Sequence, residues 1–184
     1  YCLWIKDADL GLALSINTIK ERINKTKNHR LASRDASCNN LAERSHQFRD
    51  LNEAISSQII VPSVSSENRE YIPMGILSSD TIVLNSAMVI YDAEPWLFSI
   101  LTSRMHMVWV KVVGGKLETR YRYSASVIYN NFPCPKLSDK KKELLSEHAF
   151  HILAIRENYP NKTLAELYDP AQMPEDLKQA HEKN

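Results

Sequence analysis

The stretch that most constrains the fold is KVVGGKLETRYRYSASVIYNNFPCP, residues 111–135. The apolar run MVWVKVV, which overlaps its start, is rich in β-branched residues and predicts a strand. Gly114 and Gly115 follow directly, and paired glycines predict a hairpin turn into a second strand. The two prolines of NNFPCP then end the strand pattern, because proline cannot donate a hydrogen bond to a sheet.

Side chains alternate in kind along the second predicted strand, residues 117–123. Successive side chains of a strand point to opposite faces, so alternate positions share a face. One face carries Leu117, Thr119, Tyr121 and Tyr123, and the other carries Glu118, Arg120 and Arg122. We expect the aromatic face to pack into the protein and the charged face to be available for binding.

The hydrophobic pattern elsewhere predicts a mixture of strands and helices. Short apolar runs predict strands at residues 1–5, 58–62, 71–77 and 81–93. Helical spacing predicts helices at residues 15–31, 94–105, 140–156, 163–169 and 174–181, with a short helical turn at 41–48. Ser15 is the expected cap of the first helix, and Ile16, Ile19 and Ile23 are its expected buried stripe.

These elements indicate an α+β fold with two parts. Residues 1–135 hold mixed or antiparallel strands with a few helices, and residues 136–184 form a small C-terminal helical segment. The chain has 184 residues, of which 43% are hydrophobic, so it is large enough to bury a core. Because it starts at Tyr1 within an apolar run, we expect it to be a piece of a longer protein.

The charge of the chain is balanced as a whole but not locally. The formal net charge is +1, which gives no global electrostatic argument for nucleic acid binding. Basic residues nevertheless outnumber acidic ones within residues 20–34 and 101–130. Two such zones are consistent with a basic face, although charged runs are more often plain solvated surface.

Cysteine usage and hydropathy favour a cytoplasmic protein. The three cysteines are far apart and odd in number, which argues against a disulfide framework or a zinc knuckle. The most apolar window, residues 81–110, is interrupted by charged residues and a proline, so it predicts no membrane span. No signal-peptide pattern is present.

No catalytic or metal-binding motif is found in the sequence. A DNA methyltransferase needs a glycine-rich cofactor loop and an Asn/Asp-Pro-Pro-aromatic corner, and YNNFPCP has one proline too few. The four glycines form neither a P-loop nor a dinucleotide-binding motif. His148 and His151 lie three residues apart on a predicted helix, without the spacing of a zinc site or a nearby third ligand. We therefore expect a binding module with no catalytic residue, metal or cofactor of its own.

The charged face at Glu118, Arg120 and Arg122 has the chemistry needed to read DNA bases. The planar fork of arginine matches the O6 and N7 acceptors of guanine, and glutamate accepts from the amine of cytosine. Alternate residues of a strand lie about 7 Å apart, which is about two base steps. Asn85, on another predicted strand, has the side chain that suits adenine. The alternative is that Glu118 and Arg120 only form a surface ion pair, which is common and weak.

The residues from Arg69 to Pro135, REYIPMGIL through YNNFPCP, closely resemble the target-recognition domain of MmeI-like (type IIL) restriction–modification enzymes. Those proteins carry an endonuclease, an adenine-N6 methyltransferase and a recognition domain in one chain. The opening segment, YCLWI through IIVPSVSSENR, is similar to the start of the same domain. The tail with KTLAELYDPAQMPEDLKQAH is similar to their C-terminal helical segment, so the resemblance covers nearly the whole chain.

This resemblance implies base-reading roles for particular residues. Glu118 and Arg120 match a pair that together reads one base pair. Arg122 matches a residue that reads an inner position, and Asn85 and Ser86 match positions that partner it across the site. These positions are expected to differ between family members, so the resemblance does not give the DNA sequence recognised.

Further contacts are implied around these residues. Ser63, which follows IIVP, matches another specificity position in a loop that varies within the family. Contacts to the DNA backbone, which fix register without reading sequence, are expected from Arg104, Lys111 and Lys116 and from the helix at residues 20–34.

The resemblance also implies partners and cofactors. The chain is expected to bind double-stranded DNA and to position it for a methyltransferase domain of the same parent chain, which extrudes an adenine. S-adenosylmethionine and a divalent metal belong to that parent, a bacterial defence enzyme, and not to this fragment. The alternative class is a protein–protein interaction domain whose basic faces dock an acidic partner without reading DNA sequence.

Overall fold

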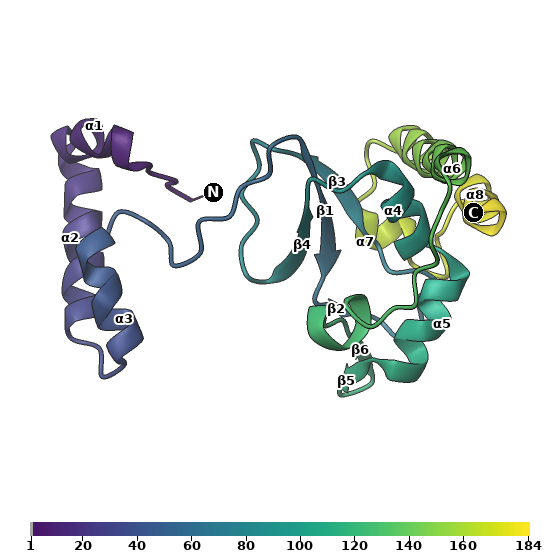
Figure 1. Ribbon diagram of the computed structural model, residues 1–184, viewed down its shortest axis with the longest axis horizontal. Helices are drawn as coiled ribbons and strands as arrows, with labels where there is room; N and C mark the ends of the chain where they lie inside the picture. Colours follow the sequence, from purple (N-terminus) through teal and green to yellow (C-terminus); the bar gives the residue numbers. More distant parts are fainter. Residues whose placement is uncertain (1) are drawn as a thin grey trace. The chain divides into compact units, whose positions relative to one another are not determined.

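The computed structural model describes residues 2–184, which pack into two compact units (Figure 1). The first unit ends at Asn52, and the second runs from Glu53 to Asn184. No helix within the described residues is long and apolar enough to cross a membrane. The boundary expected between residues 135 and 136 concerns domain organisation and stays a prediction.

The first unit is helical. It consists of η1 (Asp7–Asp9), α1 (Leu10–Ser15), α2 (Asn17–Leu31), α3 (Ala36–Asn40) and η2 (Leu41–Arg44). The guanidinium of Arg30, near the end of α2, donates to the carbonyl oxygens of Leu41, Arg44 and Gln47 over 2.7, 3.0 and 2.8 Å. Arginine suits this position because its rigid fork carries five donors. Arg30 therefore holds η2 against α2.

The expected strand at the start of the chain is not present in the described residues. Residues 2–5 form no strand, and Tyr1 lies outside the part of the chain that the structure describes. Trp4 instead stacks on Phe48, with ring centroids 5.6 Å apart. The aromatic side chain is thus packed within the helical unit, where no strand is available as a partner.

The expected helix at residues 15–31 is confirmed as α2, but its cap and its buried stripe differ from the prediction. Ser15 is the last residue of α1, and its hydroxyl donates to the carbonyl oxygen of Leu12 over 2.7 Å. It therefore does not cap α2. Of the expected stripe, Ile23 is buried, whereas Ile16 is 44% exposed.

The second unit holds two antiparallel three-stranded sheets among the residues that the structure describes (Figure 1). In the first sheet, β1 (Ser57–Pro62) lies between β3 (Gly75–Ser78) and β4 (Ala87–Tyr91). In the second, β6 (Arg120–Arg122) lies between β2 (Val64–Ser65) and β5 (Gly115–Leu117). Only Ser63 separates β1 from β2, so one stretch of chain passes from the first sheet into the second.

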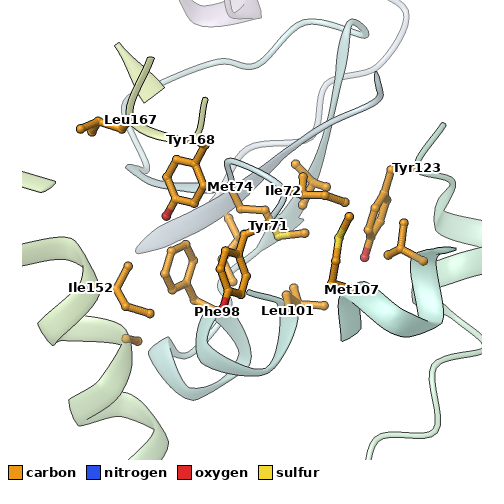
Figure 2. Close-up of a cluster of buried hydrophobic side chains, with 14 of the residues drawn as sticks. Tyr71, Ile72, Met74, Phe98, Leu101, Met107, Tyr123, Ile152, Leu167 and Tyr168 are labelled. Atoms are coloured by element: carbon orange, nitrogen blue, oxygen red, sulfur yellow. The ribbon is translucent and has the colours of Figure 1, made fainter. Parts of the chain in front are cut away.

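Helices complete the second unit and share its core. They are α4 (Pro95–Leu101), α5 (Arg104–Val113), the π-helical turn η3 (Ala125–Tyr129), α6 (Asp139–Glu157), α7 (Leu164–Leu167) and α8 (Glu175–Lys183). Helix α6 packs against α4 and α8. One cluster of buried side chains joins both sheets and the helical tail, and it includes Tyr71, Phe98, Met107, Tyr123, Ile152 and Tyr168 (Figure 2). The α+β class and the helical C-terminal segment are confirmed.

A buried arginine fixes the helical tail to the rest of this unit. Arg156 of α6 donates to the carbonyl oxygen of Met74 over 2.8 Å and from Nε to the hydroxyl of Tyr168 over 3.0 Å. That hydroxyl also lies 2.6 Å from Nε2 of His181 in α8. Burial lowers the pKa of His181 to about 3, so its imidazole is neutral at pH 7 and adds no second positive charge beside Arg156.

The run MVWVKVV is helical, so its prediction as a strand is wrong. Ser103 caps α5 by accepting from the backbone amide of His106 over 3.2 Å. The buried residues His106, Met107 and Val110 follow helical spacing. The predicted helix at residues 94–105 is therefore α4 followed by the start of α5. Strand propensity of β-branched residues depends on context, and here helical packing overrides it.

Gly114 and Gly115 do not form the hairpin turn, which corrects the prediction made from them. Gly114 joins α5 to β5 and Gly115 is the first residue of β5, whereas the turn of the hairpin comes later, at residues 118 and 119. A Cβ on Gly114 would lie 2.4 Å from the carbonyl oxygen of Val110 and 3.1 Å from Cδ1 of Ile128. Gly114 is thus required by the close approach of the chain to the end of α5.

We expect Gly114→Ala to lower the free energy of unfolding by about 1–3 kcal/mol, because the methyl group overlaps a backbone carbonyl that cannot move alone. Urea unfolding of the chain measures this. Gly115→Ala is the control, because nothing lies within 4 Å of a Cβ at that position. Its unfolding free energy is expected to stay within about 0.5 kcal/mol of the original, and equal losses in both variants would contradict the assignment.

Candidate nucleic-acid interface

The charged residues expected to read DNA lie on the hairpin of β5 and β6. Leu117 of β5 is opposite Arg120 of β6, so Glu118 and Thr119 form a two-residue turn. Residues 117–123 are therefore not one continuous strand as predicted, and Glu118 lies at the hairpin tip. Pairing of β6 with both β2 and β5 positions this turn.

The aromatic residues of the hairpin pack inward, as expected. Tyr123, directly after β6, is 5% exposed, and its hydroxyl lies 2.8 Å from Nε2 of His106 in α5. Burial lowers the pKa of His106 to about 4 and so keeps its imidazole neutral at pH 7. Tyr121 is partly buried, whereas Leu117, expected on the same face, is 44% exposed.

The charged side chains of the hairpin face solvent. The guanidinium of Arg120 donates to the carboxylate of Glu118 over 2.6 Å, and the two side chains are 47% and 75% exposed. Such exposed pairs typically contribute about 0–1 kcal/mol, so their separation to bind another group costs little. Arg122 is also exposed, and within residues 2–184 its side chain has no hydrogen-bond or ion-pair partner. All three are therefore available to a ligand.

Asn85 and Ser86 lie in a turn directly before β4, so their prediction at the centre of a strand is wrong. Both are exposed. Pairing of β1 with β4 ends at Pro62 opposite Ala87, so Ser63 and Ser86 are the next residues beyond the last pair. A turn residue has more freedom to present its side chain than a residue within a paired strand.

Ser63 connects this turn to the hairpin. Its carbonyl oxygen accepts from the backbone amide of Tyr123 over 2.9 Å, and the next residue, Val64, pairs with Arg122. The six residues expected to read bases therefore lie on connected segments: the turn before β4, the link at Ser63 between the two sheets, and the hairpin of β5 and β6.

The three residues expected to contact the DNA backbone differ in their surroundings. Lys116 is exposed on β5, and Lys111 is exposed in the last turn of α5, the end nearer the hairpin in sequence. Arg104 lies at the other end of α5 and pairs with Glu70 over 3.1 Å and with Glu182 over 3.4 Å. Lys111 and Lys116 are therefore better suited to phosphate contact than Arg104. Within the basic helix α2, Arg30 is likewise occupied by the carbonyl groups of its own unit.

Glu67 is a residue of this region that sequence reasoning missed. It lies in the turn that follows β2, and its carbonyl oxygen accepts from the hydroxyl of Tyr121 over 3.3 Å. A hydrogen bond from the side chain of Thr119 is the main reason that the pKa of the Glu67 carboxyl is lowered. Only the pairing of β2 with β6 brings these residues together, and the spacing of residues along the chain does not show it.

His148 and His151 lie on α6, and among the described residues no group of three His, Cys, Asp or Glu side chains could hold a metal ion. The free cysteines are Cys2, Cys38 and Cys134.

The fold agrees with what comparison with known proteins shows. Residues 1–136 match the family described as MmeI, target recognition domain, and residues 137–184 match the family described as MmeI, C-terminal domain. The chain belongs to the MmeI target-recognition domain family, followed by the MmeI C-terminal domain. The resemblance found in the sequence is therefore confirmed.

Two relatives show how much of a longer protein the chain corresponds to. It is 52% identical over 183 residues to DNA methyltransferase A of Bacillus subtilis (strain 168), covering 100% of this chain and 21% of that protein. It is 40% identical to the type IIL restriction–modification enzyme MmeI, solved in complex with DNA, with a TM-score of 0.92 over 99% of this chain and 24% of that one. The chain thus spans between a fifth and a quarter of these relatives.

The backbone of Glu118 has a positive φ of 59°, a region that favours glycine. Asp92 also has a positive φ, 51°, but its carboxylate accepts from the backbone amides of Ile55 and Ser56 over 2.7 and 2.9 Å. The carboxylate of Glu118 binds only the exposed Arg120 within the described residues. Local hydrogen bonds thus explain an acidic residue at position 92 but not at position 118.

We expect Glu118→Gly to leave the free energy of unfolding unchanged or to raise it by up to about 1 kcal/mol, because glycine adopts this φ without strain. Asp92→Gly, at a similar φ, is the matched comparison and is expected to lower stability, because two backbone amides lose their acceptor. Urea unfolding of both variants measures the difference. A clear loss of stability in Glu118→Gly would show that Glu118 has a structural role.

Proposed function

We propose that the chain is the sequence-specific, double-stranded DNA recognition module of a longer restriction–modification protein. One observation carries this proposal. Residues of the kinds that read bases, distant in sequence, are exposed on the turn before β4 and on the hairpin of β5 and β6, and Ser63 links these two segments. The family to which the chain belongs, and the DNA complex in which its relative MmeI was solved, support the same conclusion.

The hairpin has the dimensions and chemistry to enter the major groove. That groove is about 12 Å wide and admits a two-stranded ribbon. At the tip, Arg120 can donate to guanine O6 and N7 while Glu118 accepts from the amine of the paired cytosine, so that both read one base pair. Arg122, about 7 Å along the strand, then reaches a different position. Asn85, Ser86 and Ser63 would contact the bases next to it.

Contacts to the DNA backbone would position these side chains without reading sequence. Lys111 precedes the hairpin at the end of α5, Lys116 lies on β5 within it, and both are exposed. We assign phosphate contact to these two lysines in preference to Arg104, because two carboxylates already bind the guanidinium of Arg104. The buried network around Arg156 would brace this surface by fixing the helical tail beneath it.

The parent protein would supply the chemistry. We propose that it is a cytoplasmic enzyme that joins an endonuclease, an adenine-N6 DNA methyltransferase and this module, and that it uses S-adenosylmethionine and a divalent metal. Support comes from the relatives, one named as a DNA methyltransferase and one as a restriction–modification enzyme, both four to five times longer than the part matched. The module would hold the duplex while the methyltransferase domain extrudes an adenine.

The double substitution Glu118→Lys with Arg120→Asp tests the base-reading role. We expect the preference at one base pair to change and the preferences at all others to stay, because the reversed pair presents a donor where an acceptor was. Affinities for a panel of duplexes that differ at one base pair each, measured with the full-length protein, give the answer. A single wrong base pair typically costs about 1–3 kcal/mol. An unchanged preference would refute the assigned pair, and equal affinity of the original protein for every duplex would leave non-specific DNA binding or a protein-docking role for the basic faces.

Lys116→Ala tests the backbone contact separately. We expect weaker binding to all duplexes alike, with the slope of log affinity against log salt concentration reduced by about one, because one phosphate contact is lost. Arg104→Ala is the comparison, and its salt slope is expected to stay unchanged because the guanidinium is bound by carboxylates. A change of base preference in Lys116→Ala would contradict its role as a phosphate contact.

A further inference from the structure

We propose that Leu117 is a specificity-determining residue that contacts the methyl group of a thymine in a base pair next to the one read by Glu118 and Arg120. This inference rests on the proposed DNA-reading function and deepens it. Leu117 lies outside the set of residues expected to read bases, because simple alternation along residues 117–123 assigns it to the buried, aromatic face. The register of the hairpin places it on the opposite face.

The turn at residues 118 and 119 decides the face on which Leu117 lies. Leu117 is paired with Arg120, and Gly115 is paired with Arg122. Residues directly opposite each other in an antiparallel pair have their side chains on the same face of the sheet. Leu117 therefore shares a face with the two arginines.

The exposure of the side chains agrees with this register. Leu117 is 44% exposed, and Arg120 and Arg122 are exposed as well. Tyr121, on the other face, is partly buried, and Lys116 is paired with it. Since the remaining residue of β5 is a glycine, Leu117 is the side chain that β5 contributes to the face that carries the arginines.

The pairing also sets the distance between Leu117 and Arg120. Side chains directly opposite each other in an antiparallel pair have Cβ atoms about 4.5–5.5 Å apart. Successive bases of a DNA strand are spaced about 3.4 Å apart along the helix axis. When Arg120 contacts a guanine, Leu117 is therefore within reach of the next base pair.

The apolar side chain of leucine decides which base is favoured at that position. The major-groove edges of the bases carry hydrogen-bond donors and acceptors, and their one apolar group is the methyl group of thymine. A leucine placed on a donor or acceptor displaces water without replacing its hydrogen bond, which is costly. Contact with the methyl group instead removes apolar surface from water, and burial of one such group raises affinity about fourfold.

The test replaces single thymines of the preferred duplex by uracil, which removes the methyl group and keeps every hydrogen-bonding group of the base. The base pair whose preference changes in the double variant Glu118→Lys with Arg120→Asp marks the two neighbouring pairs to be examined. We expect a thymine in one of them, and we expect uracil in its place to weaken binding of the full-length protein about fourfold. In Leu117→Ala, the thymine and uracil duplexes are expected to bind equally.

Val112→Ala is the matched control. Val112 is 77% exposed on α5, so this change also shortens an exposed apolar side chain, but outside the hairpin. It is expected to keep the fourfold preference for thymine. The readout is the ratio of two affinities of the same variant, so a change in the fraction of folded protein does not alter it.

Three results would overturn the role of Leu117 and leave the DNA-reading function in place. They are a preference for thymine that persists in Leu117→Ala, equal affinity of the unaltered protein for the thymine and uracil duplexes, and the absence of thymine from both neighbouring base pairs. An unchanged preference in the double variant would remove the base pair on which the role of Leu117 depends and would also overturn it. Equal affinity of the unaltered protein for every duplex would overturn both the role of Leu117 and the proposed function.

Discussion

The structure of the candidate interface depends on the antiparallel pairing of β2 with β6. The hydrogen bond from the amide of Tyr123 to the carbonyl oxygen of Ser63 begins this pairing, at 2.9 Å. Once the register is set, the alternation of a strand decides which side chains are buried. Tyr121 and Tyr123 turn toward the protein, and Arg120 and Arg122, which alternate with them, face solvent. A shift by one residue would bury the arginines, at a large cost in desolvation.

The chemistry of the site could be predicted from the sequence, because it depends on local alternation. The pattern from Arg120 to Tyr123 requires no knowledge of the partner strands to show one charged and one aromatic face. The strand at residues 58–62 and the helical tail were predicted correctly for a similar reason, since their hydrophobic periods are clear. Asn85, Ser86 and Ser63 were assigned to the same site as the charged residues only through the family resemblance. The comparisons confirm that resemblance.

Features that depend on packing between distant segments could not be predicted in this way. The run at residues 107–113 has strand propensity, yet it is helical because its buried positions face the core at helical spacing. The glycines at 114 and 115 resemble a turn, but a helix end approaches Gly114 and strand pairing places the turn at Glu118 instead. Glu67 likewise reaches the hairpin only through the register of β2. Local sequence patterns thus predicted which face of an element is buried. Tertiary contacts determined where each helix or strand ends and what it packs against.

In the proposed function, Arg120 and Arg122 contact base edges from the exposed side of β6. A structure of the full-length protein bound to its preferred duplex tests this most directly. We expect both guanidinium groups within about 3 Å of acceptors in the major groove. Guanidinium groups that contact only phosphates, or a duplex bound to a surface away from the hairpin, would contradict the claim.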